Sequence, residues 1–143
     1  MEKNLNVGND KNLFDIIDQV FALISGNQID ICTFSISDDG VRFLAHLDEK
    51  ILNLKCRIII DSSALKTKTN VIFSANKVAE VRFAPNHSKI ILIRGEIGSA
   101  YIITSSNFNL TKRNELFLFG FEKEIVDQLS EFYENLWQDG IQQ

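Results

Sequence analysis

The stretch from His87 to Glu115 reads HSKIILIRGEIGSAYIITSSNFNLTKRNE. An apolar run follows Lys89, two glycines come next, and a second apolar run leads into Ser105 and Asn107. This pattern predicts two buried strands joined by a turn. Because an antiparallel pair brings the start of one strand beside the end of the other, we expect these polar residues to be neighbours.

The side chains that this hairpin brings together point to chemistry on a phosphate. An imidazole at position 87 can serve as a nucleophile or carry a proton. The Lys89 ammonium, the Ser105 hydroxyl and the Asn107 amide can hold the phosphate oxygens and offset their charge.

The spacing of these residues resembles the HKD motif of the phospholipase D superfamily, His-x-Lys-x4-Asp-x6-Gly-Ser-x-Asn. His87, Lys89, Ser105 and Asn107 match that motif, and a later glutamate, Glu115, follows. The resemblance implies that His87 attacks phosphorus, that Lys89 and Asn107 hold phosphate oxygens with support from Ser105, and that Glu115 orients a histidine. It implies no metal or other cofactor.

The chain departs from the motif in three ways. Arg94 occupies the aspartate position, and the nearest acid is Glu96; Thr104 occupies the glycine position. The distance from His87 to Asn107 is three residues longer, which a longer hairpin over residues 94–100 would accommodate. Because the chain carries one such motif, the resemblance implies a homodimer, in which the histidine of the second subunit protonates the leaving group.

The remaining sequence predicts an α/β domain with a mixed sheet and helices on both faces. Predicted helices cover 11–26, 39–54, 70–77 and 123–138, with Gly26 as the first stop, and 62–68 is expected to be a loop or short helix. Predicted strands cover 29–36, 56–61, 79–83, 89–93, 101–104 and 116–121. This order is typical of a phospholipase D-like domain.

Composition limits the class of protein. The 143 residues are 45% hydrophobic and 24% charged, which is typical of one globular domain. We expect residues 1–10 to be flexible, and we expect Cys32 and Cys56 to be reduced core residues. No apolar run is long enough to cross a membrane, and no secretory leader is recognisable, so we expect a cytoplasmic protein that does not bind membranes.

Charge is unevenly distributed along the chain. The net charge is −4, but residues 55–113 hold ten basic and three acidic side chains, a net charge of +7. Positive potential in this region would steer phosphate-bearing ligands. Five basic residues are candidate nucleic-acid contacts: Lys66, Lys68, Arg94, Lys112 and Arg113. We expect Arg94 to lie in an exposed turn.

These observations lead to one preferred hypothesis and two alternatives. We expect a metal-independent phosphodiesterase, a nuclease acting on DNA or RNA as a homodimer through a phosphohistidine. The departures at Arg94 and Thr104 support a rival, a non-catalytic module that binds nucleic acid or takes part in assembly. Phosphatidyl transfer on lipid is a third reading, against which the lack of a basic amphipathic helix argues.

Overall fold

The computed structural model describes residues 3–142, which form an α/β fold. The helices are α1 (Leu13–Ile24), α2 (Asp38–Lys50), α3 (Ala64–Thr67), α4 (Thr69–Ala75) and α5 (Lys123–Asp139). The strands are β1 (Asn4–Gly8), β2 (Gly26–Thr33), β3 (Lys55–Asp61), β4 (Glu80–Ala84), β5 (Ile90–Gly95), β6 (Ser99–Thr104) and β7 (Glu115–Gly120). The predicted α/β class is confirmed.

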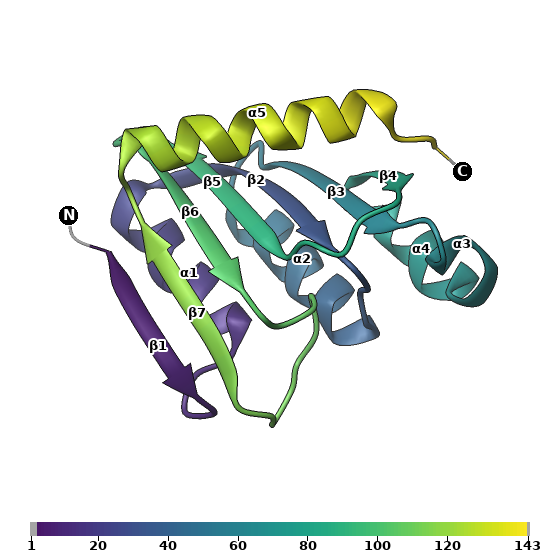
Figure 1. The fold of residues 1–143 in the computed structure, drawn as a ribbon, viewed down its shortest axis with the longest axis horizontal. Helices are drawn as coiled ribbons and strands as arrows, with labels where there is room; N and C mark the ends of the chain where they lie inside the picture. The colour runs from purple at the N-terminus through teal and green to yellow at the C-terminus, as the bar shows by residue number, and fades with distance from the viewer. Residues whose placement is uncertain (1–2, 143) are drawn as a thin grey trace.

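The strands form one mixed sheet in the order β1-β7-β6-β5-β2-β3-β4 (Figure 1). Strands β2, β3 and β4 run parallel, whereas β5, β6, β7 and β1 are joined by antiparallel pairs. The ends of β2, β3, β4 and β6 therefore lie at the same edge as the beginnings of β5 and β7. We call this the site edge. Its strand-terminal residues are Thr33, Asp61, Ala84, Ile90, Thr104 and Glu115.

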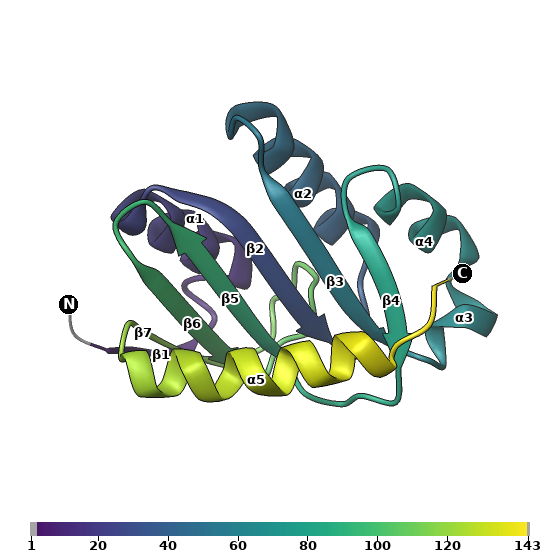
Figure 2. The ribbon, with the colours of Figure 1, turned by 90° about the horizontal axis from the view of Figure 1, so that it is seen from above.

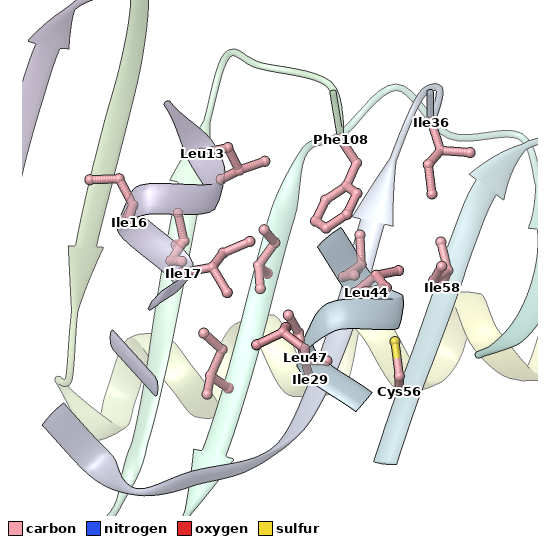
Figure 3. Close-up of a cluster of buried hydrophobic side chains, with 14 of the residues drawn as sticks. Leu13, Ile16, Ile17, Ile29, Ile36, Leu44, Leu47, Cys56, Ile58 and Phe108 are labelled. Atoms are coloured by element: carbon pink, nitrogen blue, oxygen red, sulfur yellow. The ribbon is translucent and has the colours of Figure 1, made fainter. Parts of the chain in front are cut away.

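Helices cover both faces of the sheet, as predicted (Figure 2). On one face, the apolar sides of α1, α2 and α4 meet the sheet in a core that includes Ile72. Figure 3 shows Ile17 and Leu44 in this core. On the other face, α5 packs Val126, Tyr133 and Trp137 against residues of β2 to β6. Burial on both faces explains why the central strands are almost continuously apolar.

Local sequence accounts for the helix ends. Asn12 and Asp15 form a reciprocal capping box that begins α1, and the Ser37 side chain caps α2. The predicted stop at Gly26 was wrong by one residue, because Ser25 takes the left-handed conformation with φ of 51° and ends α1. Gly26 instead begins β2, where the Phe21 ring leaves no room for a Cβ atom.

Residues 1–10 were expected to be flexible, but most of the described part of this segment is a strand. Residues 4–8 form β1, an edge strand that pairs with β7 in the register Asn4–Phe119 to Gly8–Glu115. Backbone hydrogen bonds to β7 stabilise this segment despite its polar composition, and sequence pattern does not reveal such a partner. Residues 1–2 lie outside the described residues.

Arg94 also differs from the expectation of an exposed turn. It lies in β5, and its guanidinium donates to Asp30 of β2 (Nη1 to Oδ2, 2.6 Å) and to Ser130 of α5 (2.8 Å). Asp30 is fully buried and also accepts from Arg57 (2.8 and 3.0 Å), which in turn pairs with Glu134 of α5. Arg94 therefore lies in an ion cluster centred on the buried Asp30, beneath α5, and not in an exposed turn.

Candidate active site

The connection from β4 to β5 carries His87, and the Asn86 side chain holds this connection in place. The Asn86 amide donates to the backbone oxygens of Thr33 and Ser88, both at 3.2 Å. Its carbonyl oxygen accepts from the backbone nitrogen and the hydroxyl of Ser88. The Asn86 backbone N–H donates to Asp61 Oδ1 (2.9 Å). The residue before His87 is thus tied to the ends of both β2 and β3.

The exposed His87 side chain lies beside the end of β2. Its ring centroid is 5.0 Å from that of Phe34, with the planes tilted by 49°. Lys89 Nζ lies 3.4 Å from the His87 backbone oxygen, so the ammonium and the imidazole are on the same short segment at the site edge. The contact of the ammonium is with the His87 backbone and not with the imidazole ring.

The loop from residue 105 to 114 is anchored by Phe108, which is buried. The Phe108 N–H donates to Thr33 Oγ1 (3.1 Å) and to the Ser35 backbone oxygen (3.2 Å). Gly40 of α2 packs directly on this anchor, because a Cβ atom there would lie 2.4 Å from the Phe108 oxygen. The anchor fixes the end of the loop that carries Asn107.

Ser105, Glu115 and Asn107 have defined partners. The Ser105 hydroxyl donates a short hydrogen bond to the Glu115 carboxylate and accepts from the Leu116 N–H (3.0 Å). Asn107 Oδ1 accepts from the Ser35 N–H (3.3 Å). Within residues 3–142, the amide nitrogen of Asn107 donates no hydrogen bond, so it is available to an incoming oxygen.

Sheet topology thus brings the five predicted site residues to one edge, although they do not form one contact network. His87 and Asn107 are connected through Phe34 and Ser35, while Glu115 contacts Ser105 and not His87.

The basic residues Lys66, Lys112 and Arg113 are exposed on segments that leave this edge, and Lys68 is partly buried between α3 and α4. His46 is exposed on α2, consistent with the expectation that it is a surface histidine.

Both residue changes relative to the HKD motif have a structural account. Arg94 lies seven residues from His87 along an extended segment, or about 20 Å away, so that position does not reach the site. Thr104 continues the ladder by donating its N–H to the Lys89 oxygen (3.1 Å), and its hydroxyl accepts from the Ser106 N–H (2.9 Å). Neither change removes a group from the site edge.

Sequence analysis missed two residues that build the site, Thr33 and Asn86. Thr33 is almost fully buried, and its hydroxyl accepts from Phe108 while donating to the Ser35 oxygen (2.9 Å). Nothing in its local sequence distinguishes it from an ordinary strand threonine. Asn86 was detectable in principle, because an asparagine after a proline favours a turn in which its side chain accepts from the residue two positions later.

Two ionisable groups beneath the site have shifted pKa values. The N–H of Asn86, together with Ser63, holds the pKa of Asp61 below its ordinary value. Burial raises the pKa of the Cys32 thiol to about 11, an effect that hydrogen bonds from Ser88 and Asn86 partly oppose. Cys32 Sγ lies 3.3 Å from the Ser88 hydroxyl, so this thiol contacts the residue that follows His87. Both cysteines are free, as expected.

Among residues 3–142, no group of three or more histidine, cysteine, aspartate or glutamate side chains is arranged to hold a metal ion. In the same range, no helix has the length and apolar character needed to cross a membrane.

A seven-stranded mixed sheet with helices on both faces and a histidine–lysine pair at the strand ends defines a phospholipase D-like domain. Residues 21–137 match the family described as cardiolipin synthase, PLD-like domain. The chain belongs to this family. A comparison with curated proteins found no match.

Solved structures share this fold. The chain is similar to NucT from Helicobacter pylori (TM-score 0.72, 14% identity, 98% of each chain covered). It is also similar to Nuc from Salmonella typhimurium, a phospholipase D family member (TM-score 0.65, 19% identity, 98% of this chain and 97% of that chain). A third similar structure is TrmBL2, described as an archaeal chromatin protein with a novel mode of DNA binding (TM-score 0.57, 10% identity, 99% of this chain and 54% of that chain).

Proposed function

We propose that this protein is a metal-independent phosphodiesterase that cleaves nucleic acid through a phosphohistidine intermediate in a homodimer. The observation that carries the proposal is that one sheet edge gathers His87, Lys89, Ser105, Asn107 and Glu115 in a chain of the PLD-like family. A cytoplasmic location remains an expectation from the sequence.

The proposed reaction has two steps. A His87 nitrogen attacks phosphorus and forms a P–N bond, while the P–O bond to the leaving group breaks and His87 of the partner subunit gives that oxygen a proton. Water then attacks phosphorus, the same partner histidine takes its proton, and the P–N bond breaks to release the phosphomonoester. Lys89 and the free Asn107 amide nitrogen offset the charge on the non-bridging oxygens, with Ser105 in support.

Glu115 supports the proposed two-subunit site. Within the described chain, Glu115 binds Ser105, and the His87 ring contacts Phe34 and no carboxylate. We therefore propose that the histidine oriented by Glu115 is His87 of the partner subunit. Each chain would then contribute a nucleophile to one half of the site and a carboxylate to the other.

An exposed apolar face beside the site is the surface on which we place the second copy. Leu5 and Val7 of β1 are 66% and 68% exposed, and they lie opposite Leu118 and Leu116 of β7. Ile103 of β6 also lies opposite Leu118. Opposed residues of an antiparallel pair point to the same face. In Figure 1, α5 crosses this face near the other ends of these strands. The patch continues directly into Ser105 and Glu115, so a copy bound there would adjoin the site.

The test is cleavage of single- and double-stranded DNA and RNA in EDTA by wild type, His87→Ala and Lys89→Ala. His46→Ala is the matched control, because it removes an exposed histidine in the C-terminal half of α2 that is not one of the proposed site residues. We expect wild type and the control to cut, and both site variants to lose at least about 100-fold in rate. Denaturing the wild type at alkaline pH during turnover should also trap a phosphoryl group on His87, which later treatment with acid should remove.

Two results would contradict this function. Cleavage by wild type that EDTA abolishes would exclude the metal-independent mechanism. Absence of cleavage, combined with salt-sensitive binding that His87→Ala retains, would instead support the non-catalytic module. The fold shared with TrmBL2, which is described as binding DNA, favours this alternative as the second candidate.

A further inference from the structure

Helix α4 presents a large aromatic side chain to solvent. Phe73 is 67% exposed, whereas its neighbours Ile72 and Ala75 are fully buried and hold the helix against the core. Packing of α4 therefore does not depend on Phe73. A phenylalanine held outward on a docked helix is a flat apolar surface available to a ligand.

Polar side chains surround this ring. Phe73 lines a surface hollow together with Thr69, Asn70 and Asn76, which lie on the same side of the helix by their spacing. The Lys77 ammonium lies 4.8 Å from the centre of the Phe73 ring. The hollow thus combines an aromatic ring with two amides that can donate or accept, and a cation lies against that ring.

The charge of this segment favours a polyanion. Residues 62–79 contain Lys66, Lys68 and Lys77 and no aspartate or glutamate. The helix α3, which carries Lys66, begins three residues after Asp61 at the site edge, and Asp61 accepts from the backbone next to His87. Figure 2 shows α3 and α4 side by side next to β4. A chain of phosphates could run from α4 over these lysines to the His87 segment.

We propose that Phe73 is a base-stacking subsite for single-stranded nucleic acid, with Lys66, Lys68 and Lys77 contacting the flanking phosphates. Every base has a flat face that can stack on an aromatic ring, so such a site is tolerant of sequence. In a duplex these faces are covered by neighbouring base pairs, so the subsite selects single strands. The proposal shares the substrate class of the proposed function but does not depend on chemistry at His87.

The test is binding of a labelled 12-nucleotide single strand, a duplex of the same sequence and an abasic single strand, measured by fluorescence anisotropy in EDTA with His87→Ala as the background. We expect Phe73→Ala to weaken single-strand binding about 5- to 150-fold. Duplex and abasic binding should change less than about threefold, because they offer no free base. Phe73→Tyr should restore single-strand binding.

Phe132→Ala is the matched control, since Phe132 is an exposed phenylalanine (43%) on α5, where acidic residues surround it. The proposal would be overturned if proteins with and without Phe73→Ala bound the single strand with equal affinity. It would also be overturned if Phe73→Ala weakened binding of the abasic strand as much as binding of the normal single strand. Binding that depends on Phe73 in a protein that cuts nothing would remove the proposed function and leave this subsite standing. Cleavage of single strands that is unaffected by Phe73→Ala, with unchanged binding, would exclude this subsite and leave the proposed function standing.

Discussion

At the scale of single residues, the candidate site depends on polar side chains that hold its backbone segments in place. The Asn86 side-chain amide joins the His87 segment to Thr33 of β2 and to Ser88, and its backbone N–H joins it to Asp61 of β3. Thr33 holds the Asn107 loop from the end of β2. A nucleophile must be held close to its productive geometry, so these positioning residues matter as much to the proposed chemistry as the groups that contact phosphate.

The rate at which Cys32 is alkylated measures how firmly Asn86 and Ser88 hold the His87 segment in place. Its thiol is 1% exposed and has a pKa of about 11, so at pH 8 only about 0.1% is thiolate, the form that alkylating reagents attack. We expect iodoacetamide to modify native Cys32 at least about 100-fold more slowly than in urea, with the rate rising with pH toward pH 11. Peptide mapping by mass spectrometry measures this rate.

Asn86→Ala should speed labelling of Cys32 about 5- to 30-fold, because the variant loses hydrogen bonds that hold Ser88 over the thiol. Cys56 lies in the core on the opposite face of the sheet and serves as an internal control. Unchanged Cys32 labelling in Asn86→Ala would show that this side chain does not hold the segment closed.

At the scale of elements, strand β2 supports two polar parts of the structure, the candidate site edge and the ion cluster around Asp30. Its last residue, Thr33, and Ser35 just after it bind the Asn107 loop at the site edge, and its middle carries Asp30, which bonds Arg94 and Arg57 beneath α5. Asp30 accepts from two guanidinium groups, and its pairing with Arg57 raises the pKa of that arginine above its ordinary value. Arg57 also lies 5.0 Å from the ring centres of Tyr133 and Trp137, so the cluster joins α5 to the sheet.

Asp30→Asn should lower the free energy of unfolding by about 3–5 kcal/mol, because it leaves two partly buried guanidinium groups without their shared counter-charge. Urea denaturation measures the change. Asp127→Asn is the control, since the Lys123–Asp127 pair is exposed and its loss should cost less than about 1 kcal/mol. Equal effects of the two substitutions would show that the buried cluster contributes little beyond a surface pair.

At the scale of the whole molecule, the proposed two-subunit site makes a prediction about assembly. Val7→Glu places a charge in the apolar face formed by Leu5, Val7, Ile103 and Leu116, and it should weaken the homodimer at least tenfold because the charge must be desolvated on association. Sedimentation equilibrium measures this. Leu52→Glu is the control, as Leu52 is 86% exposed beyond the end of α2.

A dimer as strong in Val7→Glu as in wild type would exclude this face as the interface. A wild-type protein that stays monomeric while cutting nucleic acid would exclude the shared site itself. Loss of both the dimer and cleavage in Val7→Glu, in a variant that remains folded, would support the complete arrangement.

The sequence by itself predicted most helices and strands and the candidate site residues, because apolar periodicity and motif spacing are local features of the chain. Apolar runs predicted the central strands within a few residues, and the polar ends of the hairpin pointed to His87, Lys89, Ser105 and Asn107 as candidates. The tertiary structure decided what depends on partners distant in the chain. Strand β1 exists because β7 supplies its hydrogen bonds, and Arg94 is held against the sheet because it pairs with Asp30, 64 residues earlier. Thr33 and Asn86 became site residues only when folding brought the ends of β2, β3 and β4 to one edge, since hydrogen-bond geometry between remote segments leaves no periodic trace in sequence.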